Sequence, residues 1–556
     1  MERKHLEAYK EARSFKGFEV WWHSVQMTLK MYITTFLIIL FLHLFLTFIF
    51  IFLFRFDDLK IVFLAFTTFS PHLWIKAVFY LVKISILFFI LCSPVWLAFP
   101  IFLRKYKTKA EKITRDEHLR GAKVISEDEL KQIIEKDLKK EDKEKLLTIG
   151  KIPIPPAAET RHFFVIGKSG TGKTRLIYSF IDQLRKRGGK AVIYDFKGDF
   201  ISCFYDPSCD LIFNPLDKRS IHWCVLREIE TFADVDSISM SLIPTSTRDD
   251  KFWVDAARDV FSSILFYLKY TKQETNHHLW HYCSLSEEDM LNQMIIAVNQ
   301  GVEIAKRALG YLLGYEKGSK VASDVLSTMR QYTNCFFYTS HLKNEFSIKQ
   351  WLESEGGGFL FIVGFPRLRD TLRPLLSLFV DITIKHALSL PESPERRIFF
   401  ILDEFSTLQK LSAVLFALEQ GRSKGLSLVL ALQDFNQLER IYHESAFSIL
   451  NNCSTIISFA LNDPKSQEVM SRVFGEAEIL ETDETLAMGV EDVKDGLSLV
   501  RRRRLEKVIL PAEFAYLPDL QAYLKILSYP VAKVKIPFIS FPIKNPVLEL
   551  EDRFVF

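Results

Sequence analysis

The chain has 556 residues, enough for two or three domains that each bury their own core. Charged residues make up 25% of it and hydrophobic residues 48%, a composition that excludes a largely disordered protein. The formal net charge of +4 neither requires nor excludes a nucleic-acid partner, because a protein can keep its basic groups inside a channel. The seven cysteines include no C-x-x-C pair, which favours a reducing compartment over a disulfide framework or a zinc site.

Two uncharged runs near the N-terminus predict a membrane anchor. Met31–Phe54 is 24 residues without Asp, Glu, Lys or Arg, long enough as a helix to cross a hydrocarbon core of about 30 Å. Ile84–Leu103 is a second such run of 20 residues, and its helix could begin earlier, near Trp74. Basic residues gather before the first run and after the second, so both termini are expected to be cytoplasmic. We therefore expect residues 1–103 to form an N-terminal cytoplasmic segment and a two-helix transmembrane hairpin.

The following segments predict a linker and then an α/β domain. Residues 104–156 are rich in Lys and Glu, and we interpret them as a charged helical linker. Beyond them, short apolar runs end in polar residues or glycine and alternate with helical stretches, which predicts a parallel sheet covered on both faces. The predicted strands are His162–Ile166, Ala191–Tyr194, Phe359–Val363, Ile398–Leu402, Leu426–Leu432 and Thr455–Leu461.

Residues 234–340 break this alternation because they carry helical patterns only, and we expect an all-α insertion there. The insertion would divide the α/β domain into residues 157–233 and 341–530. Residues 531–556 are spaced by prolines and are left as a C-terminal tail.

A glycine-rich loop follows the first predicted strand and opens a helix, the position that a phosphate-binding Walker A loop requires. The glycines let backbone N–H groups approach phosphate oxygens, and the helix N-terminus adds positive potential. In this pattern Lys173 bridges the β- and γ-phosphates and the Thr174 hydroxyl holds Mg²⁺, so the expected cofactors are ATP and Mg²⁺. The candidate nucleotide-binding residues are Gly167, Lys168, Ser169, Gly170, Thr171, Gly172, Lys173 and Thr174.

Two carboxylates end the predicted strand Ile398–Leu402 and complete a hydrolytic site. Asp403 is the candidate Mg²⁺ residue, and Glu404 is the candidate base that polarises the attacking water. A glutamate beside the metal-binding aspartate points to an NTP hydrolase rather than to a nucleotide-binding scaffold.

Other candidates follow from position. Gln433 ends the next predicted strand, where a sensor of the γ-phosphate would lie, and Arg422 follows a predicted helix. Arg422 is either an arginine finger supplied to a neighbouring subunit or a solvated cation at a helix end. The stretch Asp195–Asp199 either serves the nucleotide, belongs to a subunit interface or forms a turn.

Together these motifs resemble the type IV secretion coupling proteins, the TraD/TraG group of conjugation ATPases. The resemblance rests on Arg120–Lys123, Glu159 with His162, Tyr194–Asp199, Asn214–Ser220 with Trp223, Phe252–Arg258, Leu372–Ser377, Leu402–Glu404, Gly421 with Arg422, Gln433 and Leu510–Glu513. It implies a RecA-like P-loop motor with an all-α insertion, assembled as a homo-hexamer at the bacterial inner membrane, with the bulk of the chain cytoplasmic. It also implies that Arg422 acts in trans and that Gln433 is a coupling or sensor residue.

The same resemblance implies the partners: a relaxase bound to single-stranded DNA, or protein substrates, which the ring passes to a type IV secretion channel. Two other functions stay open at this point. An FtsK-like DNA translocase is less favoured, because only two spans and no DNA-reading winged-helix tail are recognisable. An ATP-binding membrane receptor for secreted effector proteins would bind nucleotide without turnover.

Overall fold

The computed structural model describes residues 117–138, 146–244, 251–313, 320–487 and 496–555, and residues 29–91 apart from 31, 35, 39, 46, 47, 50, 51, 53–59, 61, 62, 66 and 69. The chain divides into two compact units. One comprises Met1–Glu117 and Glu481–Arg502, and the other comprises His118–Leu480 and Arg503–Phe556. The second unit contains the nucleotide-binding motifs and is described first.

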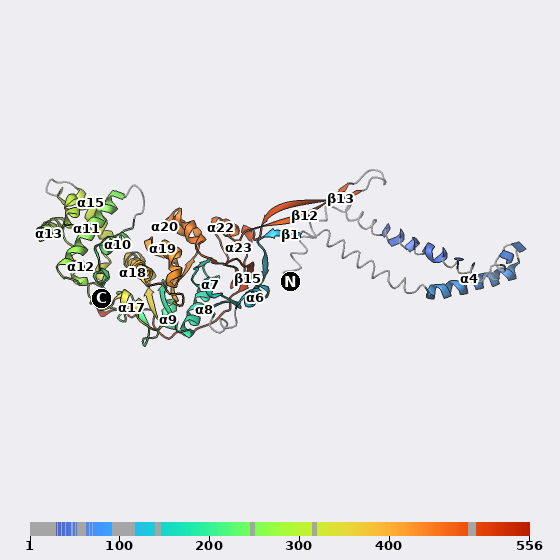
Figure 1. Ribbon diagram of the computed structural model, residues 1–556, viewed down its shortest axis with the longest axis horizontal. Helices are drawn as coiled ribbons and strands as arrows, with labels where there is room; N and C mark the ends of the chain where they lie inside the picture. Colours follow the sequence, from blue (N-terminus) through green and yellow to red (C-terminus); the bar gives the residue numbers. More distant parts are fainter. Residues whose placement is uncertain are drawn as a thin grey trace. The chain divides into compact units, whose positions relative to one another are not determined.

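A ten-stranded sheet forms the centre of this unit (Figure 1). In spatial order its strands are β2 (Val124–Ser126), β15 (Val531–Lys535), β14 (Gln521–Ile526), β11 (Thr455–Ser458), β5 (Phe163–Ile166), β10 (Leu426–Leu432), β9 (Ile398–Leu402), β6 (Lys190–Asp195), β8 (Gly358–Val363) and β7 (Leu211–Phe213). The strands from β11 to β7 run parallel, as predicted from the alternation of strands and helices. The sheet as a whole is mixed, however, because β14 runs antiparallel to both β11 and β15.

Both faces of the sheet are buried, which explains why its strands read as continuous apolar runs. Successive residues of a strand point to opposite faces, so Phe163 and Val165 belong to one core cluster while Phe164 and Ile166 belong to the other. The first cluster lies under α6 (Glu127–Asp137), α8 (Lys173–Lys186) and α9 (Asp199–Phe204). The second lies under α18 (Arg369–Ser389), α19 (Ser412–Gln420), α20 (Phe435–Tyr442), α21 (Ser445–Asn451), α22 (Pro464–Phe474) and α23 (Pro511–Ala515).

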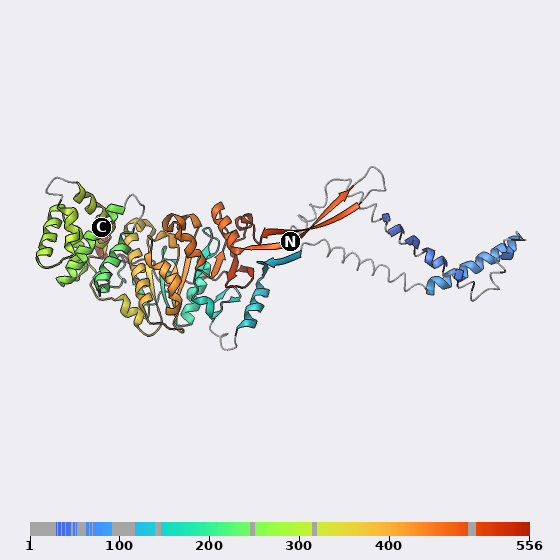
Figure 2. The ribbon, with the colours of Figure 1, turned by 45° about the horizontal axis from the view of Figure 1, so that its top comes forward.

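Between β7 and β8 the described residues form helices and isolated β-bridges, and no strand. The helices are η2 (Val225–Glu228), α10 (Phe232–Leu242), α11 (Lys251–Tyr270), α12 (Asn276–Cys283), α13 (Glu287–Asn299), α14 (Ala305–Leu312), α15 (Val321–Thr333), α16 (Phe336–Thr339) and α17 (Ile348–Glu353). Figures 1 and 2 both show the green helices α10 to α15 gathered beside the sheet, next to α18. Their buried side chains are continuous with the core cluster on the α18 face.

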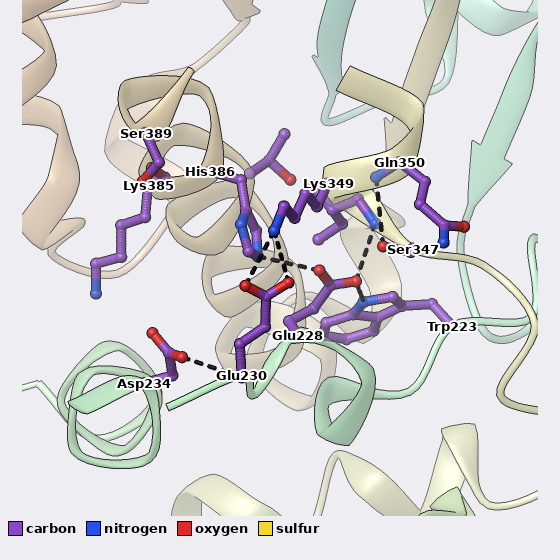
Figure 3. Close-up of polar contacts among 12 residues, drawn as sticks. Trp223, Glu228, Glu230, Asp234, Ser347, Lys349, Gln350, Lys385, His386 and Ser389 are labelled. Carbon is purple, nitrogen blue, oxygen red and sulfur yellow. Dashed lines mark hydrogen bonds and ion pairs between the residues drawn. The ribbon is translucent and has the colours of Figure 1, made fainter. Parts of the chain in front are cut away.

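A buried carboxylate joins this helical region to the sheet-covering helix α18 (Figure 3). Glu228, only 4% exposed, accepts hydrogen bonds from the Trp223 indole N–H (3.2 Å) and the Ile348 backbone N–H (2.9 Å). Its second oxygen lies 3.0 Å from Nε2 of His386, near the end of α18. A single side chain therefore ties together η2, the start of α17 and the end of α18.

The observed structure of residues 104–156 differs from the predicted helical linker. Residues 104–156 contain, in their described part, the strands β1 (Glu117–Gly121), β2, β3 (Thr148–Ile149) and β4 (Ile152–Pro153), and only α6 and the first residue of α7 (Pro156–Glu159) are helical. α6 begins with a capping box between Ser126 and Glu129, a local signal that the charged composition conceals. β2 exists because it hydrogen-bonds along β15, a partner more than 400 residues away in the chain. The tail boundary also shifts, since β15 (Val531–Lys535) belongs to the sheet.

In the other unit, helix α4 spans Pro71–Leu91. Parts of the first predicted membrane run, and residues 92–103 of the second, lie outside the described residues. Within the described residues, no helix combines the length and the apolar character needed to cross a membrane. Strands β1, β12 (Glu476–Ala487) and β13 (Gly496–Lys507) form a three-stranded sheet in this order, and the sequence bounds of the two units fall within these strands.

Candidate functional site

A cavity of about 400 Å³ opens at the carboxyl ends of the central parallel strands. The P-loop leaves β5, the acidic pair leaves β9 and Gln433 leaves β10, which lies between them in the sheet. Carboxyl ends of parallel strands converge at one edge of a sheet, and ligands of open α/β sheets bind there. The cavity is lined by Ser169, Gly170, Gly172, Lys173, Thr174, Arg175, Lys197, Asp403, Glu404, Gln433, Asp519, Leu520 and Phe538.

The glycine loop has the backbone conformation of a phosphate cradle. Gly170 and Gly172 have φ angles of +83° and +122°, which L-residues with a Cβ rarely adopt. A Cβ on Gly172 would lie 3.0 Å from the Phe459 ring and 3.2 Å from a methyl group of Leu520, so this glycine also permits a close approach. The Thr171 hydroxyl donates to the Lys168 carbonyl (2.7 Å) and closes the loop on itself.

Lys173 is buried at the base of the cradle, where its ammonium donates to the carbonyl oxygens of Gly167 and Lys168. Burial lowers the pKa of Lys173, while the nearby carboxylates of Glu404 and Asp403 act in the opposite direction. The ammonium thus lies between the loop carbonyls and the acidic pair, the place from which it can reach a phosphate chain.

The two carboxylates at the end of β9 have different environments. Asp403 is 8% exposed, and burial, followed by the charges of Asp195 and Glu404, raises its pKa to about 7. Glu404 has φ +57°, a strained conformation for a residue with a side chain, and it turns its carboxylate toward β10. Its two oxygens accept hydrogen bonds from the Gln433 amide (2.8 Å) and the Ser406 hydroxyl (3.0 Å).

These residues fit a magnesium nucleotide. A buried aspartate held close to two other carboxylates is a poor anion by itself, and a divalent cation beside it would relieve that repulsion. The Thr174 hydroxyl lines the same cavity and supplies the neutral oxygen that commonly completes such a site. Lys173 on the P-loop and Lys197 after β6 supply positive charge for the phosphates.

The structure places most of the predicted site residues in this cavity. Ser169, Gly170, Gly172, Lys173, Thr174, Asp403, Glu404 and Gln433 line it, and Gly167, Lys168 and Thr171 form the loop behind them. Arg422 does not line it. It is exposed in η6 (Gly421–Lys424), which precedes β10, whereas Gln433 follows the seven residues of this strand. The two ends of β10 are therefore about 23 Å apart, so Arg422 cannot reach the cavity of its own chain.

The stretch Asp195–Asp199 divides into two roles. The Asp195 carboxylate is fully buried and accepts four backbone N–H groups, those of Gly198, Asp199, Phe200 and Ile201. It therefore forms the turn into α9, and burial raises its pKa to about 6. Lys197 is exposed at the tip of this turn and lines the cavity.

Four cavity residues were not predicted from the sequence. Arg175 directly follows the Walker pattern, while Asp519, Leu520 and Phe538 come from the last part of the chain. Leu520 donates its backbone N–H to the Thr171 carbonyl (2.8 Å), which brings the start of β14 against the P-loop. No motif predicts Asp519, Leu520 and Phe538 as site residues, because their position depends on the antiparallel pairing of β14 with β11 and β15.

The parallel sheet, the glycine loop opening α8 and the acidic pair after β9 define a P-loop NTPase domain with an α/β fold. Residues 146–537 match the family described as the type IV secretion-system coupling protein DNA-binding domain. This match covers well over half of the chain, and the chain belongs to that family of coupling proteins.

Similar proteins and solved structures agree with this family assignment. The coupling protein TraD of Escherichia coli (strain K12) is 29% identical over 414 residues, which are 73% of this chain and 56% of TraD. The chain thus spans about half the length of that curated relative. The solved structure of the plasmid coupling protein TrwB with ADP and Mg²⁺ has a TM-score of 0.66 at 29% identity, covering 78% of this chain and 98% of that chain. The TrwB structure with the non-hydrolysable ATP analogue ADPNP matches with the same TM-score, identity and coverage.

Proposed function

We propose that this protein is a P-loop ATPase that uses ATP and Mg²⁺ to drive conjugative transfer through a type IV secretion channel. The observation that carries the proposal is the meeting of Lys173, Asp403, Glu404 and Gln433 around one cavity, from three strands of the sheet. The family match and the nucleotide complexes of TrwB support ATP and Mg²⁺ as the ligands.

The residues divide the chemical work between them. The P-loop amides and Lys173 bind the phosphates, and Thr174 and Asp403 hold Mg²⁺, which neutralises developing charge on the phosphate oxygens when it is bound. Glu404 accepts a proton from the attacking water. The Gln433 amide donates to the Glu404 carboxylate (2.8 Å) and orients it, and this contact supports the proposal that Gln433 is a sensor of the γ-phosphate.

The test is ATP turnover by the full-length protein in detergent. Lys173→Ala should lose turnover and nucleotide affinity together, because it removes the phosphate contact. Glu404→Gln should lower the turnover rate roughly 10²–10⁴-fold while the variant still binds ATP, since only the general base is removed. Turnover that is unchanged in both variants would contradict the proposed site. Nucleotide binding without any turnover in the wild type would instead favour the receptor function.

We further propose that Arg422 completes the site of a neighbouring subunit in a homo-hexamer. The support for this proposal is that Arg422 lies before the start of β10, whereas the cavity of the same chain lies at the end of that strand. Mixing Arg422→Ala with Lys173→Ala protein should restore part of the turnover. At some interfaces the intact P-loop of an Arg422→Ala subunit would then meet Arg422 of a Lys173→Ala subunit. No restoration at any mixing ratio would argue against action in trans.

The remaining assignments concern location, domains and cargo. We propose that the uncharged runs Met31–Phe54 and Ile84–Leu103 anchor the chain in the bacterial inner membrane, with the motor on the cytoplasmic side. We propose the division into a motor, residues 157–233 and 341–530, and an all-α insertion, residues 234–340; the helices that the described residues form between β7 and β8 support it.

The cargo is proposed to be a relaxase bound to single-stranded DNA, with protein substrates as a further class. The description of the matched family as a DNA-binding domain supports nucleic acid. Single-stranded DNA should therefore stimulate turnover of the wild-type protein, and this stimulation should weaken as salt rises. Turnover that does not respond to DNA would favour protein cargo.

A further inference from the structure

The last segment of the chain, residues 537–555, lies along the nucleotide-binding side of the second unit and is named here the C-terminal strap. It leaves β15 beside the P-loop, where the Ile536 N–H donates to the Leu520 carbonyl (2.8 Å). It ends where the Phe554 ring contacts Tyr338 and His341, at centroid distances of 5.7 and 5.5 Å. The strap therefore begins at the cavity and ends on the helical region.

The strap is held in place along its length. Phe541 packs between the rings of Tyr178 and Phe204, at 5.6 and 4.8 Å. The backbone N–H groups of Lys544 and Asn545 both donate to the Ser202 carbonyl, at 2.8 and 3.0 Å. Further along, Glu549 and Glu551 exchange backbone hydrogen bonds with the Leu216–Lys218 segment. These contacts anchor the strap from Phe541 to Glu551.

Phe538 is the strap residue that lines the cavity, and its ring is 65% exposed. The Arg175 guanidinium lies 4.3 Å from the centroid of this ring and donates to the Ile539 carbonyl (3.1 Å). Arg175 is the residue after Thr174, so its backbone is fixed by the P-loop helix. An aromatic ring braced by a planar cation is a surface suited to stacking with a nucleobase.

The sheet order decides which end of a nucleotide meets this ring. The hydrolytic residues Glu404 and Gln433 follow β9 and β10, on one side of β5. Leu520 precedes β14 and Phe538 follows β15, on the other side of β5. A triphosphate seated on the loop with its γ-phosphate toward Glu404 must extend its nucleoside toward the β14 and β15 side.

We propose that Phe538, braced by Arg175, is the wall that binds the base of the nucleotide, and that the C-terminal strap is part of the nucleotide site. The inference rests on the proposed function, because it assigns the second half of the same ligand. It makes the strap a determinant of nucleotide affinity, although the Walker pattern lies more than 360 residues earlier in the chain.

The experiment compares a ligand that has a base with one that lacks it. ADP and inorganic pyrophosphate both contain two linked phosphoryl groups, but only ADP carries a base, and both are titrated calorimetrically into the full-length protein in detergent with Mg²⁺. Phe538→Ala should bind ADP about 10-fold more weakly and bind pyrophosphate as the wild type does, because only stacking on the base is lost. Phe538→Trp should keep the ADP affinity, and Arg175→Ala should lose part of it.

Ile543→Ala is the matched control, since this side chain is on the same strap and is 80% exposed away from the cavity. Its affinity for both ligands should equal that of the wild type. ADP affinity unchanged in Phe538→Ala, or an equal fall for ADP and pyrophosphate, would overturn the base wall while leaving the P-loop function intact. A wild type that binds neither ligand would overturn the proposed function itself.

Discussion

Replacement of Glu228 by alanine tests the link between the helical region and the sheet. The carboxylate is buried and accepts from the Trp223 indole and the Ile348 amide while it pairs with His386 (Figure 3). Alanine leaves these three donors inside the protein without their acceptor. An unsatisfied buried donor costs about 1–3 kcal/mol, so loss of the acceptor for the Trp223 and Ile348 N–H groups costs about 2–6 kcal/mol in total. We expect a loss of unfolding free energy near that total.

The assay follows denaturant unfolding of the full-length protein in detergent by tryptophan fluorescence, together with hydrogen exchange of the amides that open α17. Ile348 is the first residue of that helix, so its amide should lose protection first. Glu230→Ala is the matched control. Glu230 lies two residues after Glu228 and pairs with Lys349 at 2.7 Å, but both side chains are about half exposed. Loss of this ion pair should therefore cost less than about 1 kcal/mol of unfolding free energy. Equal effects of the two substitutions would refute the reasoning.

Three further predictions concern the P-loop, Mg²⁺ and pH. Gly172→Ala should impair nucleotide binding more than Gly170→Ala, because both φ angles are positive but only the Cβ at 172 meets neighbouring atoms; equal affinities measured by calorimetry would contradict this. Burial raises the pKa of Asp403 to about 7, and the ionised carboxylate is the form that binds a cation. The Mg²⁺ concentration for half-maximal turnover should therefore rise as the pH falls below 7, and a flat profile from pH 8 to 6 would exclude this role. Burial lowers the pKa of His162 from 6.5 to about 4, so between these values the unfolded chain binds the additional proton. Unfolding free energy should fall by about 3 kcal/mol as the pH drops through this window, and His162→Asn should remove that part of the slope; identical pH profiles for the two proteins would refute it.

The sequence predicts which residues meet at the phosphate end of the candidate site, because the signals for them are local. A P-loop needs a strand, a glycine turn and a helix in direct succession, and an acidic pair needs only the end of a buried strand. The structure has the strand before Gly167 and the strand before Asp403 within one residue of their predicted bounds. Parallel strands then bring Gln433 to the same edge without further information.

Features that depend on distant pairing could not be predicted in this way. The charged composition of residues 104–156 indicates a helix, yet β2 is a strand because β15 offers it hydrogen-bonding partners. Thr455–Leu461 was predicted as one strand, but β11 ends at Ser458, where Phe459 turns to pack against Gly167. In both places, contacts between distant segments determine the conformation, and local propensity does not contain them.

Arg422 and Phe538 show most clearly what the sequence alone could not predict about the site. The sequence alone selects Arg422 as a candidate, but only the direction of β10 places it at the opposite end of this strand from the cavity of its own chain. Nothing in the proline-spaced tail distinguishes Phe538, and only the antiparallel course of β14 and β15 returns the chain to the P-loop. The chemistry of the phosphate end is thus determined by residues close together in the chain. The base end is determined by the tertiary structure, because strand pairing across the sheet decides which remote residues share the cavity.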